Sequence, residues 1–194
     1  MANDITIGLI GAGAAVTGGL LTGAYEHFRD WLARPQLTID YVDDSSCNVT
    51  SSYEEEGKEV TGIYVRARVR NVGKRIARKC RVFLIGIDEV QHGGTTKTAF
   101  HDSMPLCWPI RDFLPRDIPR GINSYINIVY VMKHRSGWNF GVESLLGSHT
   151  SLTTYRGTYQ LTLLATADNA DPFQFVINVI YDQDWHSFRA IPAS

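Results

Sequence analysis

The sequence contains few cysteines, and none of them is arranged as in a metal site or a disulfide framework. Cys47, Cys80 and Cys107 form no CxxC pair and have no histidine at a spacing suited to zinc. An odd number of cysteines also argues against a secreted domain held together by disulfides. We therefore expect three reduced, mostly buried thiols, with one disulfide and one free thiol as the alternative.

The chain also lacks a strong net charge and a catalytic signature. Its 19 basic and 20 acidic residues give a formal net charge of −1, so any attraction to nucleic acid or lipid needs a local patch. His101-Asp102, a pair found in metal phosphohydrolases, has no further metal ligands at a suitable spacing. Cys107 has no local Cys/His signature of a nucleophile. We predict a protein that is not an enzyme and that has no cofactor and no metal site.

The sequence does contain enough apolar residues to form a hydrophobic core. The chain has 194 residues, of which 44% are hydrophobic and 20% are charged, as is typical of a globular protein. This length allows one sizeable domain and an appendage. We place the boundary after residue 34, with an N-terminal segment of residues 1–34 and a folded domain of residues 35–194.

The N-terminal segment carries no charge from residue 5 to residue 25. About 20 apolar residues span the hydrocarbon core of a bilayer as a helix, so this run predicts one transmembrane helix and a juxtamembrane helix that ends at Pro35. Arg29 and Arg34 follow the run while only Asp4 precedes it, which places the large domain of a single-pass membrane protein in the cytoplasm. The alternative is an apolar helix buried in a soluble core.

A dinucleotide-binding loop is another reading of the same residues, because Gly11-Ala12-Gly13 follows a strand-like run. The match fails at Val16, where a third glycine or alanine is needed. On a helix, by contrast, small residues spaced four apart form one continuous row: Gly11, Ala15, Gly19 and Gly23. Such rows let helices pack closely in lipid, so we predict a homo-oligomer assembled through this face.

The folded domain is organised around two strand-like runs between residues 62 and 90, joined by a short basic turn at residues 71–74. In the first run, apolar residues alternate with Tyr64 and three arginines, the period of two that predicts a strand with one buried face. Further strands are predicted at residues 36–42, 95–100, 122–133, 158–168 and 173–181, with loops at 43–59 and 134–156. About seven short strands separated by turns predict an antiparallel β-sandwich.

Three short motifs of this domain resemble the sequence landmarks of bacterial immunoglobulin-like sandwiches of the CARDB type. They are Asn71-Val72-Gly73 followed by Ala77, then Ile118-Pro119-Arg120-Gly121, and then Gly157-Thr158-Tyr159-Gln160-Leu161. The resemblance covers residues 37–182. It implies that the first motif joins the second and third strands, that the second motif opens the fifth strand and that the third motif opens the sixth. It also implies an Ig-like fold, mainly β, and a role as an adhesive, spacer or ligand-binding module.

Basic residues are concentrated between residues 66 and 81, where eight of them occur without one acid. Seven of these are candidates for binding an anionic surface: Arg66, Arg68, Arg70, Lys74, Arg75, Arg78 and Lys79. Arginines spaced two apart on a strand share a face, so such a patch is suited to lipid headgroups or nucleic-acid phosphates. The alternative is a solvated face whose charges pair with the acids of residues 43–59.

Together these features predict a membrane-anchored binding module, a self-associating effector or accessory subunit that responds to an unknown protein partner. The second prediction is an exported, membrane-tethered adhesion or ligand-binding domain, for which the Asn48-Val49-Thr50 sequon would matter. The third is a binder of anionic lipid or nucleic acid through the basic residues. Nucleic acid is the less favoured of these two partners, because Tyr64 is the only aromatic residue interleaved with the basic residues.

Overall fold

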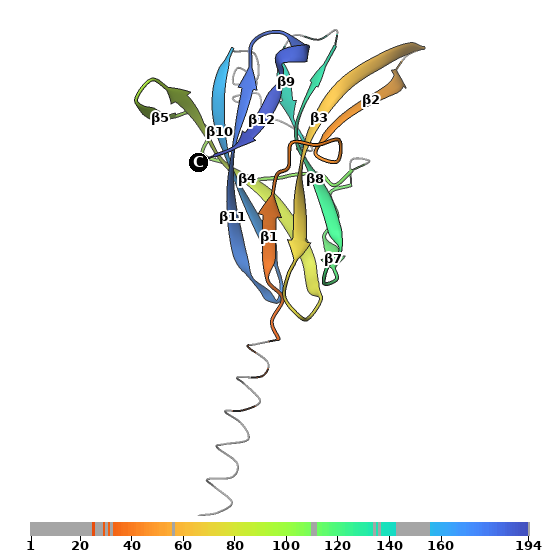
Figure 1. The fold of residues 1–194 in the computed structure, drawn as a ribbon, viewed down its shortest axis with the longest axis vertical. Helices are drawn as coiled ribbons and strands as arrows, with labels where there is room; N and C mark the ends of the chain where they lie inside the picture. Colours follow the sequence, from red (N-terminus) through yellow and green to blue (C-terminus); the bar gives the residue numbers. More distant parts are fainter. Residues whose placement is uncertain are drawn as a thin grey trace, which may run out of the picture. The chain divides into compact units, whose positions relative to one another are not determined.

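The structure analysed is a computed structural model. It describes residues 25, 29, 31, 33–55, 57–109, 112–133, 135, 137–142 and 156–193. The chain divides into two units, Met1–Arg34 and Pro35–Ser194. The second unit is mainly β, and every pairing between its described strands is antiparallel (Figure 1). The predicted antiparallel β architecture is therefore confirmed.

The first sheet has five strands in the order β1-β3-β8-β9, and β2 also pairs with β3. Their bounds are β1 (Leu37–Asp40), β2 (Asn48–Glu55), β3 (Lys58–Asn71), β8 (Asn123–Met132) and β9 (Trp138–Phe140). β1 pairs with the last four residues of β3 and β2 pairs with its first eight. Both therefore share one edge of β3, while β8 occupies the other edge.

The second sheet has seven strands in the order β12-β11-β10-β4-β5, and β6 and β7 also pair with β4. Their bounds are β4 (Ala77–Gln91), β5 (Gly94–Lys97), β6 (Met104–Pro105), β7 (Arg116–Ile118), β10 (Gly157–Ala167), β11 (Ala170–Tyr181) and β12 (Arg189–Pro192). A short 3-10 turn, η2 (Trp185–Ser187), leads into β12.

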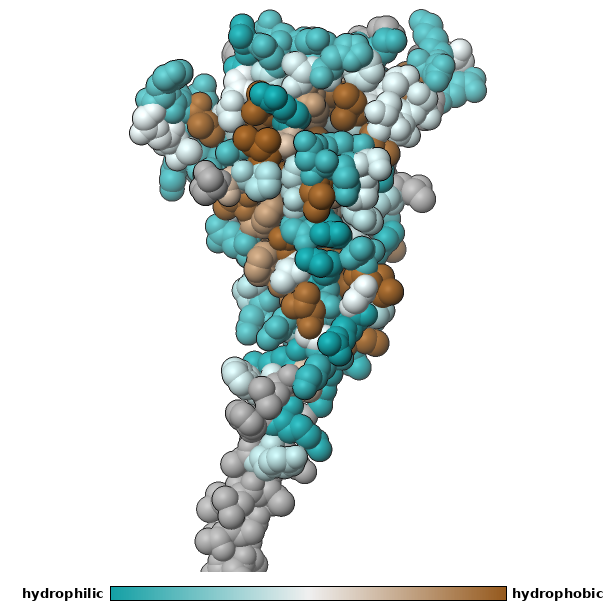
Figure 2. All heavy atoms as spheres, in the orientation of Figure 1, coloured by the Kyte–Doolittle hydropathy of each residue, from teal (hydrophilic) through white to brown (hydrophobic). Residues whose placement is uncertain are grey.

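The two sheets share one hydrophobic core. Val65 and Ile126 of the first sheet belong to the same buried cluster as Leu84, Leu161 and Ile177 of the second, and all five side chains are fully buried. On the face drawn in Figure 2, by contrast, hydrophobic residues lie in small separate groups among hydrophilic ones. The alternation predicted for β3 is confirmed, because its arginines point away from this core.

The connections between the sheets lie where the three motifs occur in the sequence. The Asn71-Val72-Gly73 motif ends β3 and begins the turn that leads to β4 in the other sheet, and Ile118–Gly121 leads from β7 into β8. The third motif, Gly157–Leu161, forms the start of β10. Membership of the immunoglobulin-like family remains a prediction.

Five of the described strands were not predicted from the sequence, namely the short β6, β7, β9 and β12 and the longer β2. Residues 43–59 were expected to form an acidic loop, but β2 occupies residues 48–55 and pairs with β3 over eight positions. The hydroxyl groups of Ser52 and Thr61 lie 2.9 Å apart across this pair. The β-branched residues Val49 and Thr50 favour an extended backbone, and this preference prevails over the polar composition of the segment.

The predicted transmembrane helix, and the membrane localisation that followed from it, are wrong. None of the helices within the described part of the chain is long and apolar enough to cross a membrane. Residues 1–24 themselves lie outside the described residues. The prediction treated an uncharged run as an apolar one, but six of the residues between 5 and 25 are glycine. Glycine buries no side chain and costs about 1 kcal/mol per residue in a helix relative to alanine.

Two further predictions depended on that helix. The placement of the large domain in the cytoplasm falls with the membrane span from which it was argued. The helix row of Gly11, Ala15, Gly19 and Gly23 lies outside the described residues. Self-association through that row therefore stays a prediction.

Candidate functional site

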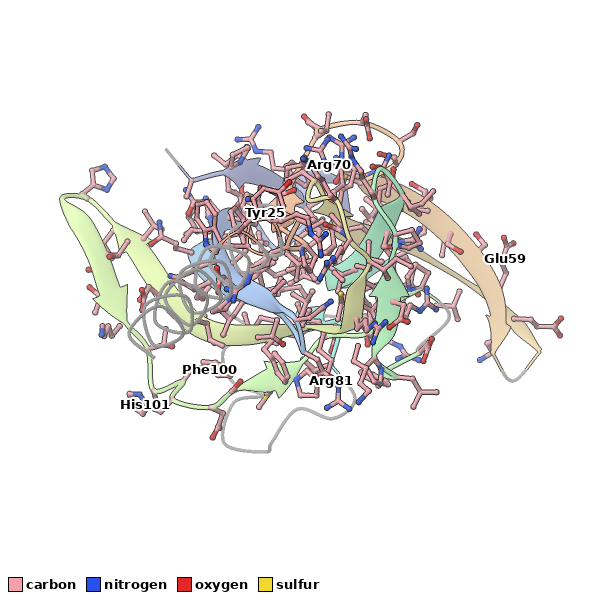
Figure 3. All side chains as sticks on the ribbon, turned by 90° about the horizontal axis from the view of Figure 1, so that it is seen from below. Tyr25, Glu59, Arg70, Arg81, Phe100 and His101 are labelled. Atoms are coloured by element: carbon pink, nitrogen blue, oxygen red, sulfur yellow. The ribbon has the colours of Figure 1, made fainter. Side chains whose placement is uncertain are left out.

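The seven basic residues singled out from the sequence do not form one surface. Arg66, Arg68 and Arg70 lie on the outer face of β3 in the first sheet, whereas the other four belong to the β3–β4 turn and the start of β4. In Figure 3, Arg70 of β3 and Arg81 of β4 lie on opposite sides of the ribbon. The predicted patch is thus divided between two sheets.

The arginines of β3 are largely occupied within their own sheet. Arg68 donates from Nε to Oδ1 of Asp40 at 2.7 Å, and Arg70 forms an ion pair with the other oxygen of the same carboxylate. Arg66 donates from Nε to Oδ1 of Asn127 at 2.9 Å. The hydrogen bond from Arg68 to Asp40 raises the pKa of that guanidinium. Two of the three guanidiniums therefore share one carboxylate of β1, which offsets one of their two positive charges.

The acid that pairs with them was not among the predicted partners. The predicted partners lie in residues 43–59, but Glu59 lies at the far end of the β2–β3 hairpin, well away from Arg70 (Figure 3). Asp40 lies directly opposite Arg68 because β1 pairs with the end of β3. This neighbour is fixed by the register between two strands that lie 28 residues apart in the chain.

The β3–β4 turn is held in place by the buried side chain of Asn71. Its Nδ2 donates to the carbonyl oxygens of Arg75 at 2.6 Å and Ile118 at 3.0 Å. Its Oδ1 accepts from the backbone N–H of Gly73 at 3.0 Å and of Gln36 at 3.2 Å. All four hydrogen-bonding positions of the Asn71 amide are satisfied. These hydrogen bonds compensate the free-energy cost of removing this fully buried side chain from water.

A second asparagine joins the β10–β11 turn to the same region. Asn169 donates from Nδ2 to the carbonyl oxygen of Ile76 at 2.9 Å and accepts from the backbone N–H of Arg78 at 2.8 Å. The neighbouring Asp168 forms an ion pair with Lys79 at 3.1 Å. Asn71 and Asn169 therefore bring three turns together at one end of the domain.

We call this end the basic loop end and define it as residues 72–79, 119–122 and 168–169. Its exposed basic residues are Lys74, Arg75, Arg78, Lys79 and Arg120. Arg120 was not predicted as a site residue, although it lies in one of the three sequence motifs. The backbone N–H of Gly121 donates to the carbonyl oxygen of Asn71 at 3.2 Å, which holds this turn against the β3–β4 turn.

The basic loop end also exposes apolar side chains. Val72 is 47% exposed, Ile76 is 49% exposed and Ile122 is 53% exposed. Each lies in a turn that also carries an exposed basic residue. Single exposed aliphatic residues are common on protein surfaces, but three of them in two adjoining turns form a mixed basic and apolar surface.

The remaining candidates from the sequence are the His101-Asp102 pair and the three cysteines. The described part of the chain contains no group of three or more His, Cys, Asp or Glu side chains that could hold a metal ion. Cys47, Cys80 and Cys107 are buried and free of disulfides, as predicted. We found no matching protein-family model, no similar curated protein and no similar solved structure, so the functional argument rests on this geometry.

Proposed function

We propose that the unit Pro35–Ser194 is a non-catalytic binding module whose basic loop end binds an acidic, partly apolar segment of a protein partner. The observation that carries this proposal is the convergence of three turns through Asn71 and Asn169. These hydrogen bonds hold the turns that carry five exposed basic side chains and three exposed aliphatic ones.

The rigidity of the turns supports this function. A binding surface whose backbone is already ordered loses less conformational entropy when a partner docks. Exposed charges of one sign also accelerate encounter with a partner of the opposite sign. The aliphatic side chains of Val72, Ile76 and Ile122 add apolar area that a purely electrostatic contact would not use.

The same geometry favours a peptide over a nucleic acid. A nucleic-acid strand needs a track of cations that follows its phosphates, and the β3 row would be the natural extension of the basic loop end. Asp40 forms ion pairs with both Arg68 and Arg70 in that row, so both guanidiniums are held within the sheet and one of their two charges is offset. A short segment with both acidic and aliphatic residues matches the mixed surface that remains.

The test is binding of a fluorescein-labelled 12-residue peptide of alternating Glu and Leu to the full chain, measured by fluorescence anisotropy. In the test variant Lys74, Arg75, Arg78 and Arg120 are replaced by Ser. In the control variant four exposed basic residues elsewhere are replaced by Ser: Lys58, Lys97, Lys133 and Arg189. Both variants lose the same net charge.

We expect the test variant to bind at least about tenfold more weakly than the control variant at low salt, because each cation next to the peptide contributes a few tenths of a kcal/mol or more. The difference should shrink at high salt, where exposed charges are screened. Equal losses in both variants would contradict the proposal. Tighter binding to a single-stranded DNA of the same charge, or to anionic vesicles, would contradict the choice of partner.

A further inference from the structure

The outer face of the first sheet carries a feature that the basic loop end does not use. Tyr64 of β3 lies directly opposite Tyr130 of β8, and their rings stack with centroids 5.4 Å apart and an interplanar angle of 24°. The register then shifts by one residue, so that Arg66 lies opposite Asn127 instead of Ile128. Without this bulge, the period of two would turn Asn127 toward the core. The bulge places an amide beside two aromatic rings.

Irregular segments of chain, at residues 106–109, 112–114 and 141–142, lie beside this face, and we call them the wall. The carbonyl oxygen of Cys107 accepts from the backbone N–H of Asn127 at 2.9 Å, and the N–H of Cys107 donates to the carbonyl oxygen of Gly141 at 2.7 Å. Gly141 lies so close to β8 that an added Cβ would be 2.2 Å from the carbonyl oxygen of Asn127. The fully buried Trp108 fixes the wall, since its Nε1 donates to the carbonyl oxygen of Leu114 at 2.9 Å.

Between the wall and the sheet lies a pocket of about 170 Å³. Its lining includes Tyr64, Tyr130, Phe113, Phe140, Asn127 and Cys107. Pockets for drug-sized ligands usually have a volume of about 300 to 1,000 Å³, so this one suits a much smaller molecule such as a single ring. Its aromatic lining favours a flat apolar body.

Arg66 does not line the pocket itself but adjoins it, since its Nε donates at 2.9 Å to Oδ1 of Asn127, which does line it. Among the described residues the terminal nitrogens of Arg66 have no acceptor and no carboxylate partner. Its neighbours on the strand differ, because Arg68 and Arg70 share Asp40. A guanidinium whose Nε is occupied still presents two terminal N–H groups that match the two oxygens of a carboxylate.

We propose that this pocket binds a small planar monocarboxylate, with its ring against the aromatic lining and its carboxylate on the terminal nitrogens of Arg66. The inference goes beyond the proposed function, because the pocket lies on the outer face of the first sheet and not at the basic loop end. Cys107 provides the means of observing it. This thiol lines the pocket and is 5% exposed, whereas Cys47 is 0% exposed and Cys80 is 1% exposed.

The experiment measures the alkylation of each cysteine of the full chain by iodoacetamide, using mass spectrometry. Benzoate should slow alkylation of Cys107 while leaving Cys47 and Cys80 unchanged. Benzyl alcohol, which has the ring without the charge, should need about 10- to 100-fold higher concentration for the same protection, since its single neutral hydroxyl cannot form the bidentate ion pair of a carboxylate with a guanidinium. Acetate, which has the charge without the ring, should protect less than benzoate.

Variants of the protein then test whether Arg66 is the positive charge that binds the carboxylate of benzoate. Arg66→Gln should remove the advantage of benzoate over benzyl alcohol, whereas Arg81→Gln, which removes an exposed cation of the other sheet, should keep it. The four-residue Ser variant of the basic loop end should also keep it, which separates this inference from the proposed function. Equal protection by benzoate and benzyl alcohol in the unmodified protein, or no protection by either, would overturn the inference whatever the variants do.

Discussion

Replacing Asn71 by alanine should destabilise the domain far more than a typical surface substitution. The change leaves four backbone groups without their side-chain partner: the N–H groups of Gln36 and Gly73 and the carbonyl groups of Arg75 and Ile118. A typical intramolecular hydrogen bond contributes about 0.5 to 1.5 kcal/mol. Because water can reach some of these groups near the turn, we expect the free energy of unfolding to fall by about 3 to 4 kcal/mol.

The assay is urea unfolding of the full chain, followed by tryptophan fluorescence. Asn71→Asp is the informative second variant, since it preserves the shape and both acceptor positions but places a carboxylate oxygen against two carbonyl oxygens. It should be at least as destabilising as Asn71→Ala. Asn169→Ala is the matched control, because it removes two hydrogen bonds of an exposed side chain and should cost less than about 1.5 kcal/mol. A loss below about 1 kcal/mol for Asn71→Ala, or a neutral Asn71→Asp, would refute the reasoning.

Three further changes should have distinct effects. Gly141→Ala should lower the free energy of unfolding by about 2 to 3 kcal/mol because its Cβ would overlap the backbone of Asn127, whereas Gly157→Ala should be mild; urea unfolding compares them. Burial raises the pKa of the Cys80 thiol from 9.0 to about 11, so between these pH values the unfolded chain loses a proton that the folded chain keeps. Stability should therefore fall by up to about 2 kcal/mol as pH rises from about 9 to 11, and Cys80→Ala should flatten that dependence. Asp40→Asn should cost about 1 kcal/mol, measured by thermal unfolding, with a smaller loss at high salt.

Each of these outcomes has a contrary result. Similar losses for both glycine variants would show that the wall beside β8 can move. An unchanged alkaline dependence in Cys80→Ala would show that another group titrates in that range. A salt-independent loss in Asp40→Asn would mean that packing, and not charge, holds the β3 arginines.

The regular strands could be predicted because their pattern is local. The alternation of β3 and the apolar residues of β10 and β11 depend on neighbours one or two positions away, and each of these strands occurs where the sequence indicated. The β3–β4 turn was also predictable, because Asn71-Val72-Gly73 is a turn sequence. The role of Asn71 was not, since its four hydrogen-bonding partners include Gln36 and Ile118, which lie 35 and 47 residues away.

The candidate sites were predictable only in part. Lys74, Arg75 and Arg78 were singled out, but Arg120 joins them through a contact between turns that no local pattern reveals. The pocket beside Arg66 depends on a one-residue register shift in the pairing of β3 with β8, which the sequence of either strand does not specify. The N-terminal prediction failed for another reason, because it relied on the absence of charge and gave no weight to the six glycines of the run, which disfavour a helix.

Hydrogen–deuterium exchange of the full chain, with and without the Glu-Leu peptide, tests the central claim most directly. The proposed function predicts that the peptide slows exchange of backbone amides in residues 72–79, 119–122 and 168–169, three segments far apart in sequence. Protection confined to other segments, such as residues 38–42 or 66–70, would contradict it, as would binding without protection anywhere in the basic loop end.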